Sequence, residues 1–142
     1  MMIELPGTQE KHYKEVYMSV EHNKELVMRF LNEFMIAHKT EVLDDLLGPQ
    51  YTQHNPGLGH GKAELIKFFQ DFWEIHPWPG YYLKRTIAEN DLVAIHYHFQ
   101  PDPDEDGYAI VDIFRIEDGK LAEHWDVCQK MPEKSKNNSP MF

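Results

Sequence analysis

Apolar residues recur at helical spacing in the first half of the chain. From 20 to 38, hydrophobic positions fall every three or four residues around charged ones, which predicts a helix. A short second helix is expected over 40–47, with Thr40 as its N-cap and Gly48-Pro49 as its end, and a third over 62–73. The stretch YTQHNPGLGHGK between the last two reads as an extended piece and a glycine-rich loop.

The second half alternates apolar and polar residues and is rich in β-branched and aromatic side chains. This pattern predicts four strands over 81–88, 92–99, 108–117 and 120–129, with turn-forming residues between them. Helices followed by an antiparallel meander indicate an α+β fold in which the sheet curls against the helices. We therefore expect one domain over 19–132, an N-terminal extension over 1–18 and a flexible tail over 133–142.

Alternation assigns the strand side chains to two faces. In the second strand, His96 and His98 lie opposite a set of large apolar residues; in the last two, Asp112 shares a face with Phe114, and His124 with Asp126. The apolar set of the second strand is Val93, Ile95, Tyr97 and Phe99.

The turn at 117–119 sets which of these side chains meet. A three-residue loop closed by Gly119 would pair Asp112 with His124, whereas a two-residue Asp-Gly turn would place Asp112 beside Trp125. We favour the three-residue loop because it gathers the ionisable residues on one face. That concave face would carry Asp112, His124 and Asp126, with His96 and His98 beside them.

Charge and composition limit which classes of binding partner and which cellular location are expected. The 142 residues include 24 acidic and 14 basic ones, a net charge of −10, which disfavours nucleic acid and anionic membrane surfaces. No apolar run approaches the roughly 20 residues that span a bilayer, and no signal peptide is evident, so a cytoplasmic protein is expected. The single cysteine, Cys128, is interpreted as structural.

The Asp112–His124 pair is what a general acid–base site needs, because a carboxylate can orient an imidazole that titrates near neutral pH. A buried structural ion pair would give the same pattern. His96 and His98 could also join His124 around a metal ion, although no further metal motif supports this and we predict no metal. The predicted ligand-contacting residues are His54, His96, His98, Tyr51, Phe114 and Trp78.

The motifs YTQHNP, GKAELIKFF, DLVAIHYHF and above all DIFRIEDGKLAEHWDVCQ resemble the SnoaL-like proteins of the nuclear-transport-factor-2-like superfamily, over about 19–132. The resemblance implies a curved sheet wrapped around helices and acid–base chemistry next to a carbonyl without a cofactor, as in the family's polyketide cyclases. Asp126 matches the catalytic aspartate best and Asp112 is its rival; His54, His96 and His124 match substrate contacts. The pocket is richer in histidine than in true cyclases, so a non-catalytic ligand-binding domain stays open.

The expected partners are a small organic carbonyl compound and a second copy of the chain. Helices cover one face of a curved sheet, so an apolar outer face would form a homodimer, as superfamily members commonly do. The predicted interface is Val93, Ile95, Tyr97, Phe99, Val111 and Ile113. With the faces reversed, His96 and His98 would point outward and the aromatic set would fill the interior.

Overall fold

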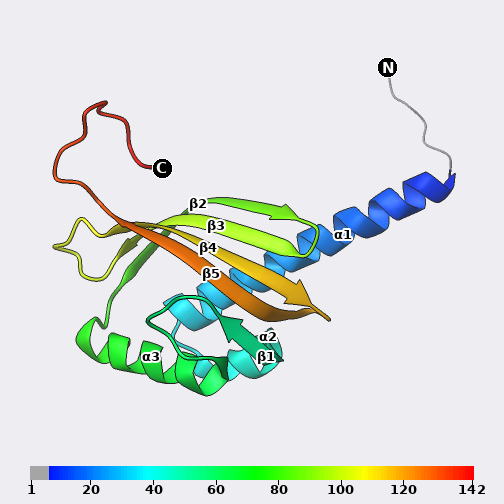
Figure 1. Ribbon diagram of the computed structural model, residues 1–142, viewed down its shortest axis with the longest axis horizontal. Helices are drawn as coiled ribbons and strands as arrows, with labels where there is room; N and C mark the ends of the chain where they lie inside the picture. The colour runs from blue at the N-terminus through cyan, green and yellow to red at the C-terminus, as the bar shows by residue number, and fades with distance from the viewer. Residues whose placement is uncertain (1–6) are drawn as a thin grey trace.

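The computed structural model describes residues 7–142 and confirms the α+β class (Figure 1). No helix within these residues is long and apolar enough to cross a membrane. The helices and strands are α1 (Gly7–Arg29), η1 (Phe30–Ile36), η2 (Thr40–Val42), α2 (Leu43–Leu46), β1 (Leu47–Gln53), α3 (Gly61–Ile75), β2 (Gly80–Glu89), β3 (Leu92–Gln100), β4 (Tyr108–Glu117) and β5 (Lys120–Lys130).

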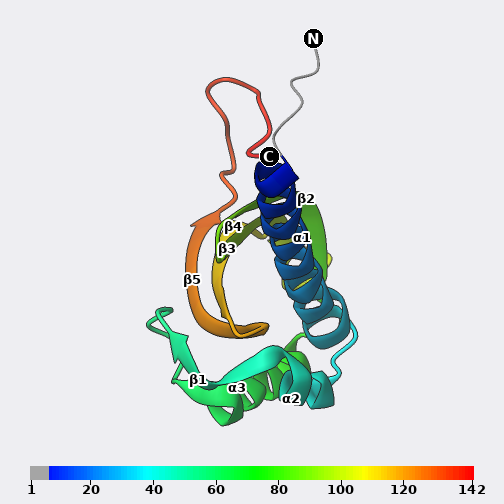
Figure 2. The same ribbon diagram turned by 90° about the vertical axis from the view of Figure 1, so that its right-hand side faces the viewer.

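The five strands form one mixed sheet in the order β1-β5-β4-β3-β2. β2 to β5 pair as an antiparallel meander, whereas β1 lies parallel to β5 at the edge. Figure 2 shows the meander curving into an arc, with α1 beside it and α3, α2 and β1 below. The interior of this arc is the concave face on which the site is expected.

The predicted start of the first helix is wrong. α1 begins at Gly7, so residues 7–18 of the predicted extension belong to the same helix as the residues after Ser19. Residues 1–6 of that extension lie outside the described part of the chain. The side chains of 7–19 are all exposed, and Figure 1 shows this half of α1 projecting beyond the sheet. Packing begins with Val20, where apolar residues at helical spacing first meet the sheet.

The second helix is shorter than predicted. A 3₁₀ turn, η2, leads into the single turn of α2, and no side chain caps either piece. Leu47 already belongs to β1, so Gly48-Pro49 lies in an edge strand, where a proline costs no ladder hydrogen bond.

The core lies between the helices and the concave face. The π-helix η1 supplies four buried side chains, Phe30, Leu31, Phe34 and Met35. The Phe30 ring packs on Phe34 and on Phe114 of β4, with ring centroids 5.1 and 5.2 Å apart. These contacts attach the helical layer to the middle of the sheet.

The β4–β5 register differs from the one predicted. Asp118 and Gly119 form a two-residue turn with φ of 50° and 72°, the conformation of a type I′ turn. Ala122 is then an extra residue, because Ile116 pairs with Leu121 and Arg115 with Glu123. Turn and bulge together shift the register by two, so His124 keeps its predicted face but pairs with Phe114, and Asp112 pairs with Asp126.

The predicted face of β3 is wrong, and the reversed assignment holds. Val93, Ile95 and Tyr97 are 0%, 0% and 2% exposed and fill the interior. His96 and His98 therefore point to the outer face. Burying two branched aliphatic side chains and an aromatic ring stabilises the fold by several kcal/mol in total, which outweighs any gain from grouping ionisable residues.

Candidate functional site

A cavity of about 190 Å³ opens between the helices and the concave face of the sheet. Aromatic side chains line most of it and polar groups gather at one end. The lining residues are Phe30, Met35, Tyr51, Gln53, Asn55, Leu58, Leu65, Phe68, Phe69, Phe72, Tyr81, Tyr97, Phe99, Ile110, Asp112, His124, Asp126 and Cys128.

Asp112 and His124 form a buried hydrogen-bonded pair at the polar end. His124 Nε2 lies 2.9 Å from Asp112 Oδ1, and the Tyr97 hydroxyl donates to Asp112 Oδ2 at 2.7 Å. Asp112 is 4% and His124 6% exposed. Both carboxylate oxygens of Asp112 are therefore engaged by neighbouring side chains.

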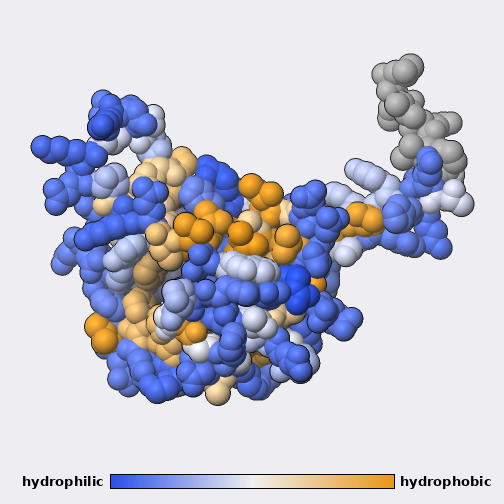
Figure 3. Space-filling model, in the orientation of Figure 1, coloured by the Kyte–Doolittle hydropathy of each residue, from blue (hydrophilic) through white to orange (hydrophobic). Residues whose placement is uncertain are grey.

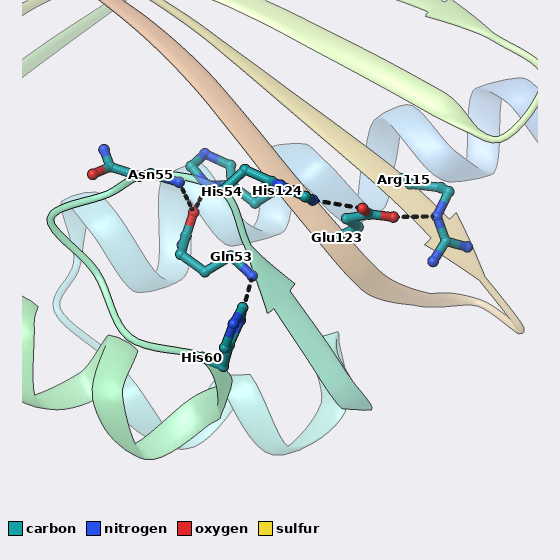
Figure 4. Close-up of polar contacts among 7 residues, drawn as sticks. All are labelled: Gln53, His54, Asn55, His60, Arg115, Glu123 and His124. Atoms are coloured by element: carbon teal, nitrogen blue, oxygen red, sulfur yellow. Dashed lines mark hydrogen bonds and ion pairs between the residues drawn. The ribbon is translucent and has the colours of Figure 1, made fainter.

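Gln53 at the end of β1 fixes the protonation of the other imidazole nitrogen. The Asn55 backbone N–H donates to Gln53 Oε1 at 3.1 Å, so this atom is the amide oxygen and an acceptor. His124 Nδ1 lies 2.6 Å from the same oxygen and must carry a proton (Figure 4). The Gln53 backbone N–H donates to His60 Nδ1 at 3.1 Å, which ties β1 to the start of α3.

These contacts leave one proton between Asp112 and His124. With Nδ1 protonated, the Nε2···Oδ1 contact is either an imidazolium facing a carboxylate or a neutral imidazole facing a carboxylic acid. The pair is neutral in both arrangements. A group that can hold its proton at either of two atoms is suited to general acid–base work.

Asp126 is the second carboxylate of the site and is only half-buried. Asn55 Nδ2 donates to its Oδ2 at 2.6 Å. Among the hydrogen bonds of residues 7–142, none involves its Oδ1, which leaves that oxygen available to a ligand. Ligand atoms of Asp112, His124 and Asp126 lie within 4.8 Å of one another, so these three residues are the set that could hold a metal ion.

Two tyrosine hydroxyls complete the polar end. Burial, then the charge of Asp112 and that of Asp126, raise the pKa of Tyr51; burial and Asp112 raise the pKa of Tyr81. Both phenols therefore stay protonated across the physiological pH range and can donate a hydrogen bond to a ligand oxygen.

The family model of the SnoaL-like domain matches residues 27–124. The chain belongs to the SnoaL-like family. None of the curated proteins matches it.

Solved structures similar to this SnoaL-like domain share its fold at low identity. A candidate ketosteroid isomerase from Kribbella flavida is 16% identical in sequence and superposes with a TM-score of 0.66. The matched region covers 87% of this chain and 91% of the isomerase chain. A candidate polyketide cyclase from Bacillus cereus is 22% identical in sequence, with a TM-score of 0.66. The matched region covers 75% of this chain and 74% of the cyclase chain. A candidate polyketide cyclase from Acidithiobacillus ferrooxidans is 16% identical in sequence, with a TM-score of 0.62. The matched region covers 75% of this chain and 87% of the cyclase chain.

The structure brings four of the predicted site residues of this SnoaL-like domain to the cavity: Asp112, His124, Asp126 and Tyr51. Phe114 is 0% exposed and supports the imidazole of His124 from behind, with ring centroids 4.9 Å apart. Trp78 is 82% exposed and lies outside the lining.

The three other predicted ligand-contacting histidines also lie outside the cavity lining. His54 stacks on Trp125, with ring centroids 4.9 Å apart. Its Nε2 lies 2.6 Å from Glu123 Oε2, and Figure 4 draws this contact. His96 and His98 sit on the outer face, where their rings lie 5.5 and 5.1 Å from that of Phe142. The alternative metal set of His96, His98 and His124 is therefore not assembled, because His96 and His98 lie on the outer face and His124 faces the interior.

Sequence reasoning missed five residues that shape the polar end: Gln53, Asn55, Tyr81, Tyr97 and Cys128. Gln53 carried a usable signal, since alternation puts it on the same face as Tyr51. Asn55 carried none, because its contact with Asp126 spans 71 positions and depends on β1 lying beside β5.

Cys128 offers a test of the cavity's electrostatics. Burial, followed by the charges of Asp126 and Asp112, raises the pKa of its thiol to about 11. A raised pKa leaves little thiolate at pH 8, so alkylation by iodoacetamide should be slow there and accelerate about tenfold per pH unit until near pH 11. The pH profile of the alkylation rate, followed by mass spectrometry, measures this.

Substituting Asp126, whose charge raises the pKa of the Cys128 thiol, tests the electrostatic cause of this slow alkylation. Asp126→Asn should lower the thiol pKa and speed alkylation at pH 8, whereas Asp104→Asn, in an exposed loop, should leave it unchanged. Rapid labelling of the wild type at pH 7 would contradict the prediction.

Proposed function

We propose that this protein is a small-molecule enzyme that uses general acid–base catalysis next to a carbonyl, without a cofactor, with Asp126 as the base. One observation carries the proposal: a half-buried carboxylate at the polar end of an aromatic cavity, held by Asn55 through one oxygen only. An oriented carboxylate with an uncommitted oxygen is suited to removing a proton from carbon.

The second carboxylate has a different role in this proposal. Both oxygens of Asp112 are hydrogen-bonded, to His124 and to Tyr97, so it is poorly placed to accept a proton from a substrate. The Asp112–His124 pair instead keeps the polar end in place, because its carboxylate oxygens and ring nitrogens are all engaged by neighbouring side chains. We therefore propose Asp126, rather than Asp112, as the base.

The reaction step balances within the residues of the cavity. Asp126 Oδ1 takes the proton from the carbon next to the carbonyl, and the C–H electron pair becomes the enolate double bond. A protonated tyrosine, Tyr51 or Tyr81, donates a hydrogen bond to the enolate oxygen as its charge grows. Asp126 then returns the proton to another carbon of the enolate, which completes an isomerisation. Alternatively, the enolate attacks a second carbonyl carbon of the substrate, and Asp126 gives its proton to the resulting alkoxide, which completes an aldol-type cyclisation.

Exchange of carbon-bound hydrogen tests this step without knowledge of the natural substrate. Small cyclic ketones in D₂O should lose α-hydrogen signal by NMR faster with the protein than with buffer. Asp126→Asn should lower the protein-dependent rate at least about 100-fold, the usual contribution of a general base. Asp104→Asn, an exposed aspartate in the β3–β4 loop, is the matched control.

Two results would contradict the proposal. A folded Asp126→Asn variant with the wild-type exchange rate would remove Asp126 as the base. No exchange above buffer for any ketone that binds would favour the alternative function, a domain that binds a small ligand without changing it.

We also propose that the protein forms a homodimer through the outer face of the sheet. Val111 and Ile113 of the predicted interface lie on that face, whereas its β3 residues do not. Val93, Ile95 and Tyr97 are core, whereas Tyr82, Ile87 and Val127 are 51%, 63% and 68% exposed. Figure 3 shows hydrophobic side chains gathered over the strands on this outward side. Exposed apolar patches of this kind mark partner surfaces.

Light scattering at micromolar concentration should give twice the 16.8 kDa chain mass. The double substitution Ile87→Lys and Val127→Lys should yield a folded monomer, because it places charges on the proposed interface. Ile75→Lys, at an equally exposed position on α3, should leave the dimer intact. A monomeric wild type would refute this interface.

A further inference from the structure

We infer that the ligand of this cavity is an uncharged molecule built on a single ring, and that the site rejects organic anions and multi-ring compounds. The inference rests on the proposed function in taking this cavity as the substrate site. It goes further by naming the class of ligand from the volume, charge and lining of the cavity.

Volume limits the ligand to one ring. The cavity measures about 190 Å³. A cavity of about 150 Å³ holds one benzene molecule, and sites for drug-sized ligands begin at about 300 Å³. One ring with a small polar substituent therefore fits, whereas two fused or linked rings need side chains to move. Three of the lining aromatic residues, Phe30, Tyr51 and Tyr97, are buried in the close-packed core, which resists such movement.

Charge limits the ligand to uncharged groups at the polar end. The polar end holds two carboxyl groups, Asp112 and Asp126, and one imidazole, His124, so its acidic groups outnumber its basic ones. No lysine or arginine appears among the lining side chains of residues 7–142. A carboxylate or phosphate would lose its hydration there without gaining a cation, which costs several kcal/mol.

The lining also indicates which groups the ligand carries. Phe30, Phe69, Phe72 and Phe99 offer apolar surface suited to a flat ring, while Tyr51 and Asp126 supply polar groups to the same cavity. An uncharged oxygen can accept from the tyrosine, and a C–H, N–H or O–H can meet the carboxylate. Carbonyl compounds that exist partly as enols present both features on neighbouring atoms.

Three probes of related shape separate size from charge: 4-methylbenzamide, 4-methylbenzoate and biphenyl-4-carboxamide. The first two differ only in charge, and the first and third differ by one ring. Isothermal titration calorimetry with the wild-type protein should show 4-methylbenzamide binding at least tenfold more tightly than either of the others.

Two variants assign these preferences to the cavity. Asp126→Asn removes the uncompensated charge and should raise the affinity for 4-methylbenzoate at least tenfold relative to the amide, with Asp104→Asn unchanged. Phe72→Ala enlarges the cavity and should raise the affinity for biphenyl-4-carboxamide at least tenfold; Phe72 is partly exposed, so the loss is tolerable for folding.

The inference is overturned if 4-methylbenzoate or biphenyl-4-carboxamide binds the wild type within threefold of 4-methylbenzamide, or if 4-methylbenzamide shows no binding at 10 mM. Binding is measured without turnover, so this outcome is distinct from failure of the proposed function. The predicted order of affinities with no ketone exchange would support the ligand class and reject the catalysis.

Discussion

Asp112→Ala is expected to lower the free energy of unfolding by about 3–5 kcal/mol, the usual cost of removing one partner from a buried ionic pair. Asp112 is 4% exposed and bonds His124 and Tyr97. Without it, the Tyr97 hydroxyl and His124 Nε2 lose their partners in a site that water enters only through the cavity. Urea denaturation of the two proteins, monitored by tryptophan fluorescence, measures the difference.

Asp112→Asn is the control that separates hydrogen bonding from charge. The asparagine oxygen can accept from Tyr97, and its N–H can replace the proton shared with His124, since Gln53 already keeps His124 in the Nδ1-protonated form. We therefore expect its free energy of unfolding to lie within about 1 kcal/mol of wild type. Equal destabilisation by asparagine and alanine would show that the proton assignment is wrong.

Phe34→Ala is expected to destabilise the protein by a similar amount, about 3–5 kcal/mol, because it empties a ring-sized space in the core. Phe34 is 0% exposed, and its ring lies 5.1 Å from Phe30, 4.9 Å from Phe69 and 5.6 Å from Trp73 by ring centroids. The loss therefore loosens η1 and α3 together. Thermal and urea unfolding would both report it.

Phe68→Ala is the matched control one turn away from the same cluster. Its ring touches Phe69 at 5.4 Å but is 42% exposed, so removing it should cost about 1 kcal/mol or less. If Phe34→Ala cost no more than Phe68→Ala, η1 would not be the anchor of the helical layer.

Sequence alone determined four of the five strands and most of the helical content, because both depend on local periodicity; the edge strand β1 (Leu47–Gln53) was not predicted as a strand. The strand predicted over 108–117 matches β4 residue for residue, and 92–99 and 120–129 each fall one residue short of β3 and β5. Alternation also placed His124 and Asp126 on one face, and the DIFRIEDGKLAEHWDVCQ motif pointed to the family that the comparison confirms.

The tertiary structure decided which polar groups meet, for reasons that no local pattern contains. Core packing turned Tyr97 inward and His96 and His98 outward, because apolar volume must fill the concave face. The bulge at Ala122 added a register shift of one residue to that of the turn. The residue paired with Asp112 across the strands is therefore Asp126 instead of His124, and both lie on the same face of the sheet. The parallel pairing of β1 with β5 brought Gln53 and Asn55 to the site across 71 positions of sequence. Long-range pairing depends on how the whole sheet closes, and that closure positions the groups that set the proton of His124 and orient Asp126.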